Sequence, residues 1–105
     1  MPKIIAKAKL VENLRSIVDN SRTHTLACDL PVAKGGNDTG PTALELAIMA
    51  LSDCAVTIFA KVAKQSNVDV KTIEVITEAE KPENSPTLEG VKIKVNVSAK
   101  ARKQL

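Results

Sequence analysis

The sequence has almost no aromatic side chains. Among its 105 residues there is no tryptophan, no tyrosine and a single phenylalanine, Phe59. Proteins that bind single-stranded nucleic acid stack the bases on aromatic rings, and this chain offers no such platform. Its net charge of +3 comes from 15 basic and 12 acidic side chains spread along the chain, without a dense basic block. The composition therefore predicts that nucleic acid is not a partner.

Metal ligands and phosphate-binding motifs are scarce as well. One histidine and two cysteines, Cys28 and Cys54, are too few for a tetrahedral zinc site, and the cysteines are not spaced as a CxxC pair. The run GGNDTG, residues 35–40, lacks the flanking strand and the lysine of a phosphate-binding loop. We therefore expect no metal and no cofactor.

A long uninterrupted apolar segment is also absent. The first ten residues, MPKIIAKAKL, carry lysines where a signal peptide has a continuous apolar core. The longest apolar stretch, residues 43–63, is interrupted by Glu45, Asp53 and Lys61, and charges at this density argue against a membrane span. We therefore expect a cytoplasmic protein that does not bind a membrane and whose thiols stay reduced.

Alternating apolar and polar residues predict strands in both halves of the chain. In the first third, residues 3–11, 14–20 and 22–30 predict two hairpins or a three-stranded meander. In the second half, residues 68–81 and 88–100 predict one long hairpin. The closing run SAKARKQL, residues 98–105, is typical of the opening turn of another helix, with Ser98 as its cap.

Between these strands, residues 42–65 predict one long helix that follows a loop over residues 31–40. Pro41 suits its first turn, because the missing N–H would be unpaired there anyway. Apolar residues recur at helical spacing at Leu44, Ile48, Leu51, Ala55, Ile58 and Val62. The first half of this helix is apolar almost all round, which is typical of a helix buried on most sides. One short chain cannot supply that cover, so we expect a homodimer with this helix near the interface.

The predicted order of strands, long helix and hairpin indicates an α+β fold with antiparallel sheet, in a single domain. The run CDLPVAKGGNDTGPTALELAIMALSDCAV, residues 28–56, then carries a resemblance. It contains an Asp-x-Pro turn, a Gly-Gly loop, GPT followed by a Leu-Glu-Leu helix start, and a cysteine late in that helix. The matching residues are Asp29, Pro31, Gly35, Gly36, Gly40, Pro41, Thr42, Leu44, Glu45, Leu46 and Cys54. The chain resembles OsmC-like proteins, the group that contains the organic hydroperoxide resistance proteins.

The resemblance implies an intertwined homodimer with long central helices crossed by antiparallel sheets. It also implies peroxidase chemistry of the peroxiredoxin kind, in which Cys54 attacks a hydroperoxide as a thiolate and becomes a sulfenic acid. A second cysteine then forms a disulfide, which a dithiol reductant reopens. Arg22, with Arg15 as the second candidate, and Glu45 match the positions of residues that prepare the thiolate.

The chain departs from that pattern at its end. The second cysteine of the family lies in a helix after the hairpin, so we expect residues 1–105 to form one OsmC-like domain that lacks the C-terminal helix and the last strand. Cys28 is the candidate second thiol, provided that its Cα lies within about 7 Å of that of Cys54. Two alternatives stay open: a catalytically incomplete dimeric module, structural or binding a small apolar ligand, and a redox sensor that uses Cys28 and Cys54.

Simpler structural roles also fit these residues. Cys54 can serve as a small residue in a crowded helix, and Glu45 as a favourable acid in a first helical turn. Glu45 and Cys54 are nine positions apart, a rotation of about 900° at ~100° per residue, so they face opposite sides of a straight helix. Glu45 would then meet the thiol only through a kink or from another copy of the chain.

Overall fold

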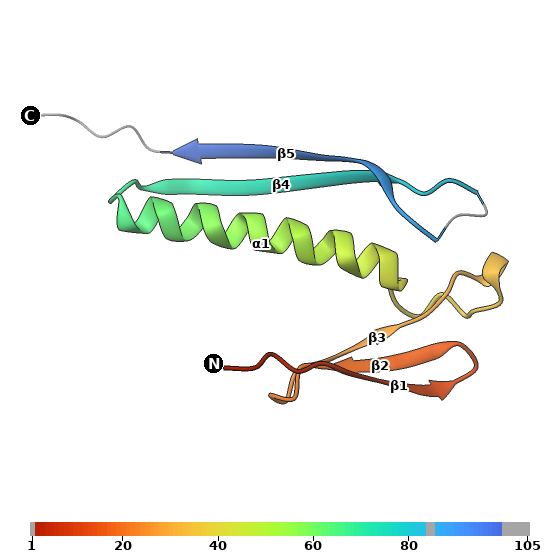
Figure 1. Ribbon diagram of the computed structural model, residues 1–105. Helices are drawn as coiled ribbons and strands as arrows, with labels where there is room; N and C mark the ends of the chain where they lie inside the picture. The colour runs from red at the N-terminus through yellow and green to blue at the C-terminus, as the bar shows by residue number, and fades with distance from the viewer. Residues whose placement is uncertain (1, 84–85, 100–105) are drawn as a thin grey trace, which may run out of the picture. The chain divides into compact units, whose positions relative to one another are not determined.

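A computed structural model describes residues 2–83 and 86–99 of the chain (Figure 1). Its elements are β1 (Lys7–Glu12), β2 (Arg15–Asp19), β3 (Thr25–Cys28), the short 3₁₀ turn η1 (Val32–Lys34), α1 (Ala43–Gln65), β4 (Val70–Glu80) and β5 (Glu89–Ala99). One long helix and two antiparallel sheets confirm the predicted α+β class. The chain divides into two compact units, residues 1–46 and 47–105. The single domain that was predicted stays a prediction.

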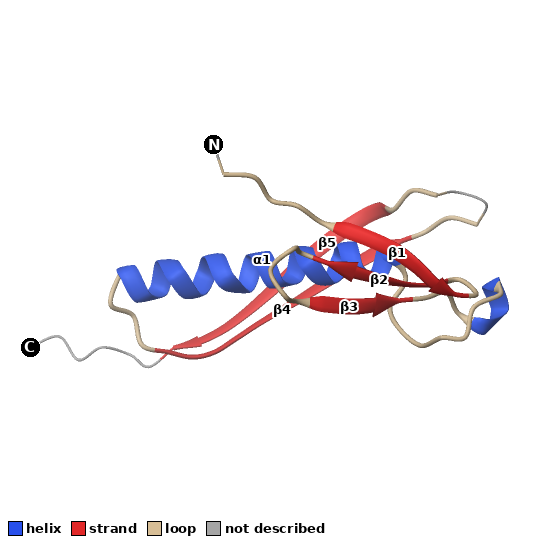
Figure 2. Cartoon of the chain, turned by 90° about the horizontal axis from the view of Figure 1, so that it is seen from below, coloured by secondary structure: helices blue, strands red, loops and turns tan. Residues whose placement is uncertain are grey.

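The first unit contains an antiparallel meander. Its strand order is β1-β2-β3, which selects the meander from the two predicted alternatives (Figure 2). β1 begins at Lys7, because this is the first residue that pairs with β2, opposite Asp19. The strand predicted over residues 3–11 therefore starts too early, because Ile4 and Ile5 precede β1 and both are exposed.

The second unit contains the predicted hairpin. β4 and β5 pair antiparallel, with Ile73 opposite Val97 and Val75 opposite Val95. Directly opposite residues lie on the same face of a sheet, so these side chains form one apolar face. The Oγ of Ser52 on α1 lies 2.6 Å from Oγ1 of Thr77 on β4 and forms a hydrogen bond with it, so this helix contacts the hairpin (Figure 1).

The end of the hairpin corrects one prediction. Ser98 does not cap a helix; it lies in β5, opposite Thr72, and the strand continues to Ala99, opposite Val70. Apolar residues still alternate at Val95, Val97 and Ala99, so the strand pattern extends past the polar residue that suggested a cap. The remainder of the predicted helix start lies outside the described residues.

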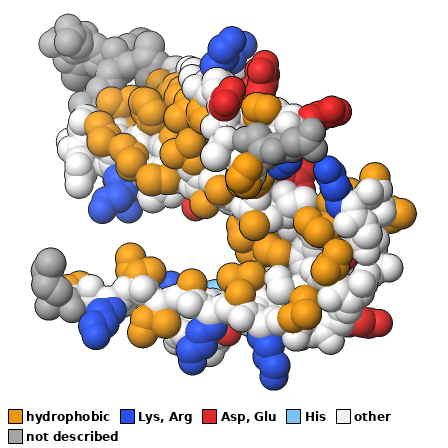
Figure 3. Space-filling view, turned by 45° about the vertical axis from the view of Figure 1, so that its right-hand side comes forward, with side chains coloured by type: hydrophobic (Ala, Val, Ile, Leu, Met, Phe, Trp, Pro, Cys, Tyr) orange, Lys and Arg blue, Asp and Glu red, His pale blue; other side chains and the backbone are white. Residues whose placement is uncertain are grey.

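Within this single chain α1 has no buried side chain. Its exposed large apolar residues are Met49, Leu51, Ile58, Phe59 and Val62. Figure 3 shows hydrophobic side chains open to solvent on the surface of the chain. The cover that the sequence predicts for this helix is thus not supplied by the described part of its own chain, and the homodimer stays a prediction.

By length and composition alone α1 could cross a membrane. An 18-residue window within Ala43–Gln65 has a mean hydropathy of 1.8 and at most two charged residues. The core helix of a soluble protein passes the same test, so one such helix is weak evidence. The prediction that this stretch does not enter a membrane stays a prediction.

Candidate functional site

The first turn of α1 is closed by a pair of reciprocal hydrogen bonds. The backbone N–H of Glu45 donates to Oγ1 of Thr42 at 3.1 Å, and the N–H of Thr42 donates to Oε1 of Glu45 at 2.9 Å. This is a capping box, in which two side chains satisfy backbone donors that have no partner inside the helix. Thr42 is therefore the N-cap, and Pro41 stands before it rather than in the first turn as predicted.

The loop that leads into α1 is organised by the carboxylate of Asp29, which is only 3% exposed. One oxygen, Oδ1, accepts the N–H of Leu30 at 2.7 Å. The other, Oδ2, accepts the N–H of Asn37 at 3.2 Å, the N–H of Thr39 at 3.1 Å and the hydroxyl of Thr39 at 2.7 Å. The backbone N–H of Asp29 donates to the carbonyl of Pro41 at 3.0 Å. One residue thus joins the end of β3 to both ends of the loop.

These hydrogen bonds lower the pKa of Asp29 from 3.8 to about 2. The hydroxyl of Thr39 has the largest effect, the three backbone N–H groups add to it, and desolvation opposes it. Because the pKa is lower in the folded state, the ionised carboxylate stabilises the fold at every pH above about 4 and this contribution is lost as the pH falls through about 2.

We therefore expect the loop to open only in strong acid. The NMR shift of the Thr39 amide should titrate with a midpoint near pH 2, because this amide reports the ionisation of Asp29 directly. Asp29→Asn should abolish this titration of the Thr39 amide. The amide of Val75 in β4 is the control, because its shift should not titrate near pH 2. A Thr39 midpoint near pH 4 would contradict the prediction.

Two glycines allow the backbone of this loop to pack closely. A Cβ on Gly36 would lie 2.0 Å from the carbonyl oxygen of Leu30, and a Cβ on Gly40 would lie 2.2 Å from that of Ala27. Both distances are far shorter than any contact a side chain makes, so the two positions require glycine. GGNDTG is therefore a compact structural loop that places the first turn of α1 beside the end of β3.

The candidate second thiol lies at that same end of β3. Cys28 is the last residue of the strand, opposite Ser16, and is only 7% exposed. It forms no disulfide. A buried thiol is poorly placed to meet a peroxide or a reductant in solution, so Cys28 behaves as a small core residue in this unit.

The two candidate arginines lie at opposite ends of the meander, Arg15 at the end that holds Cys28 and Arg22 at the other end. Arg22 is exposed in the turn between β2 and β3, and its N–H donates to Oδ1 of Asn20 at 2.9 Å. The Asn20 side chain closes the turn, so β3 begins at Thr25 rather than at Arg22 as predicted. Arg15, in β2, forms an ion pair of 2.8 Å with Glu12. Arg22 and Cys28 flank β3 at opposite ends and are not brought together.

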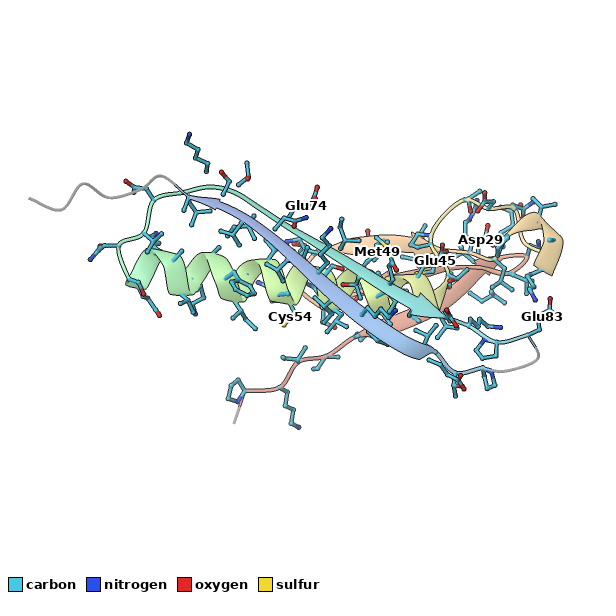
Figure 4. All side chains as sticks on the ribbon, turned by 90° about the horizontal axis from the view of Figure 1, so that it is seen from above. Asp29, Glu45, Met49, Cys54, Glu74 and Glu83 are labelled. Atoms are coloured by element: carbon cyan, nitrogen blue, oxygen red, sulfur yellow. The ribbon has the colours of Figure 1, made fainter. Side chains whose placement is uncertain are left out.

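The candidate attacking thiol, Cys54, lies in the middle of α1 and is exposed (Figure 4). It is two positions from Ser52, a rotation of about 200°, so it lies on the side of α1 away from the residue that contacts β4. Its neighbours one turn away are Ala50 and Ile58. The thiol is therefore accessible and lies among apolar side chains.

Glu45 and Cys54 stay apart on the same helix. α1 is continuous from Ala43 to Gln65, and the two residues are nine positions apart, which corresponds to about 13 Å along the axis and half a turn. Within one chain the carboxylate of Glu45 serves the helix cap. Any contact with a Cys54 thiol would have to involve another copy of the chain.

The capping box leads to a test that separates structure from chemistry at Glu45. Thr42→Ala should lower the free energy of unfolding by about 1 kcal/mol, because it removes the N-cap oxygen. Glu45→Gln should leave stability nearly unchanged, because glutamine is also accepted at this position of the box. Chemical denaturation measures both. A Glu45→Gln loss as large as that of Thr42→Ala would show that the box needs the charge.

The second unit has an open groove of about 640 Å³ between the later part of α1 and the start of β4. Its apolar lining comes from Val56, Ala60, Ala63, Val68, Val70 and Ile73. Cys54 is not among the lining residues. In the described ranges 2–83 and 86–99, no group of three or more histidine, cysteine, aspartate or glutamate residues could hold a metal ion.

Comparison with known proteins gives a family. The family model described as OsmC-like protein matches residues 35–105, more than half of the chain. A solved structure from Psychrobacter arcticus 273-4, named for osmotic stress induction and a detoxification response, matches with a TM-score of 0.81 at 16% identity, over 97% of this chain and 75% of that one. A structural genomics structure matches with a TM-score of 0.80 at 21% identity, over 95% and 72%. A search of curated proteins found no match.

Proposed function

Because the chain belongs to the OsmC-like protein family, we propose that it reduces organic hydroperoxides with Cys54 as the attacking thiol. The observation that carries the proposal is the exposed position of Cys54 in the middle of α1, on the side away from β4. An attacking thiol has to meet its substrate, and Cys54 is the accessible one of the two cysteines. The likeness in fold to a protein named for a detoxification response is consistent with this function.

In the proposed reaction the Cys54 thiolate attacks the distal oxygen of the hydroperoxide. A sulfur–oxygen bond forms and the O–O bond breaks, so the thiol is oxidised to a sulfenic acid. The peroxide is reduced to an alkoxide, which takes a proton and leaves as the alcohol. Arg22 and Glu45 are the proposed partners that prepare the thiolate, which the positive charge of Arg22 would favour. Glu45 would act from another copy, given its distance from Cys54 along α1.

The sulfenic acid is then returned to the thiol by an external dithiol. One thiolate of the reductant attacks the Cys54 sulfur, releases water and forms a mixed disulfide. Its second thiolate breaks that disulfide, which frees Cys54 and leaves the reductant oxidised. The burial of Cys28 supports an external reductant over a Cys28–Cys54 bridge.

The proposal is tested by trapping the intermediate. The native protein is treated with one equivalent of an organic hydroperoxide in the presence of a sulfenic acid trap, and the adduct is located by mass spectrometry. We expect the adduct on Cys54 in the wild-type protein and in Cys28→Ala, and none in Cys54→Ser. A wild-type protein that consumes no peroxide and gives no adduct at Cys54 would overturn the proposal, and a loss of two hydrogens per chain instead would favour the Cys28–Cys54 redox sensor.

A further inference from the structure

Asp29 holds the segment that directly precedes α1 at three places. Its Oδ2 binds the N–H groups of Asn37 and Thr39, and its own N–H binds the carbonyl of Pro41. The next residue along the chain is Thr42, the N-cap whose hydroxyl and N–H hold Glu45. Asp29 therefore fixes the backbone up to Pro41, and the peptide bond from Pro41 leads directly to the Thr42–Glu45 capping box, within one compact unit.

An amide side chain cannot replace the Asp29 carboxylate in this loop. All four of its partners are donors, and a carboxylate offers only acceptors. An asparagine would turn its NH₂ group towards at least one backbone N–H, whichever way the amide lies. The neighbouring Asp38 provides a contrast: its carboxylate makes no hydrogen bond or ion pair with the described residues, although its N–H donates to the carbonyl of Leu30 at 3.0 Å.

We infer that Asp29 is a positioning residue, which holds residues 37–41 so that Thr42 and Glu45 meet in a single arrangement at the start of α1. Asp29 does not touch the reacting atoms; it acts on Glu45 through the loop. The kinetic consequence rests on the proposed function, in which Glu45 helps to prepare the Cys54 thiolate. The structural consequence, a fixed first turn of α1, does not.

The structural consequence is tested by amide hydrogen exchange on the full chain. In Asp29→Asn the N–H groups of Thr42 and Glu45 should exchange at least about tenfold faster than in the wild type, because both report the capping box that the loop holds in place. Asp38→Asn, the same change in the same loop, should leave them within about twofold. Unchanged exchange at Thr42 and Glu45 in Asp29→Asn would overturn the inference.

If Asp29→Asn proves too unstable, Thr39→Val replaces it. This variant removes a single hydrogen bond to Oδ2, the one from the hydroxyl, and keeps the size of the side chain. It should speed exchange at Thr42 and Glu45 in the same direction, and Thr39→Ser, which keeps the hydroxyl, should restore the wild-type rates. Equal rates in the valine and serine variants would contradict the inference.

The kinetic consequence is tested by a double-mutant cycle. Asp29→Asn should lower the rate of hydroperoxide reduction about tenfold through misplacement of Glu45. In a Glu45→Gln background the same change should cost less than about twofold, because the carboxylate that it positions is already gone. Equal losses in the two backgrounds would show a general structural effect and overturn the kinetic part.

The two possible failures can be told apart. If wild-type protein and Cys54→Ser consume peroxide equally slowly, the proposed function fails, while faster exchange at Thr42 and Glu45 in Asp29→Asn still supports the positioning role. If Cys54 is required but the Asp29→Asn losses are equal in both backgrounds, the proposed function stands and the coupling between Asp29 and Glu45 does not.

Discussion

Replacement of Cys54 by serine should lower steady-state hydroperoxide reduction by at least about a thousandfold. A serine hydroxyl is a far weaker nucleophile at neutral pH than a thiolate, and no other exposed cysteine lies in the described part of the chain. The substitution exchanges sulfur for oxygen at an exposed helix position, so the free energy of unfolding should change little. Peroxide consumption with excess dithiol, together with thermal unfolding, measures both effects.

Cys28→Ala is the matched control for that experiment. Its thiol is buried at the end of β3, so its loss should not affect the first, stoichiometric consumption of peroxide. A stoichiometric phase that survives in Cys54→Ser and is lost in Cys28→Ala would assign the attacking thiol to Cys28. Equal, slow consumption by all three proteins would instead favour the catalytically incomplete module.

Gly40→Ala should lower the free energy of unfolding by about 3 kcal/mol or more. The added methyl group would lie 2.2 Å from the carbonyl oxygen of Ala27 and 2.8 Å from its carbon. Both are backbone atoms, so no flexible side chain can move aside and the loop must separate from β3. The same displacement would strain the hydrogen bond from the N–H of Asp29 to Pro41, and the loss should appear in denaturant unfolding monitored by circular dichroism.

Gly90→Ala separates this clash from the general cost of replacing a glycine. Gly90, in β5, has φ +61°, and no atom lies within 4 Å of the position of an added Cβ. The alanine there meets only backbone strain, which costs roughly 1–2 kcal/mol. Gly40→Ala should therefore be clearly the more destabilising of the two. If both variants lose the same amount, the close approach to Ala27 does not limit stability.

The regular elements were predicted well from the sequence because each obeys a local periodicity. Apolar residues at helical spacing predict a helix over residues 42–65, and α1 runs from Ala43 to Gln65. The alternation around Ile73 and Val95 predicts the hairpin of β4 and β5, down to the residues that share a face. The errors lie at the ends, at Ile4 and Ser98, where pairing with a neighbouring strand decides where an element begins or stops.

The candidate site was harder to predict because its contacts are not periodic. The capping box has a sequence signal, threonine followed three residues later by glutamate, which would have placed Thr42 as the cap and Pro41 before it. The role of Asp29 has no such signal. Its partners Asn37 and Thr39 are eight and ten positions away across an irregular loop, and only the folded path of that loop brings their N–H groups to one carboxylate.

The lack of buried side chains on α1 has a consequence for how the protein melts. A 23-residue helix this apolar gains little stability while its outer side stays in water, so most of its free energy of folding must come from whatever covers it. A partner that binds only the folded chain raises the transition temperature by mass action. If that partner is a second copy, dilution of the protein alone should lower the melting temperature. The measurement is the midpoint of thermal unfolding at a series of protein concentrations.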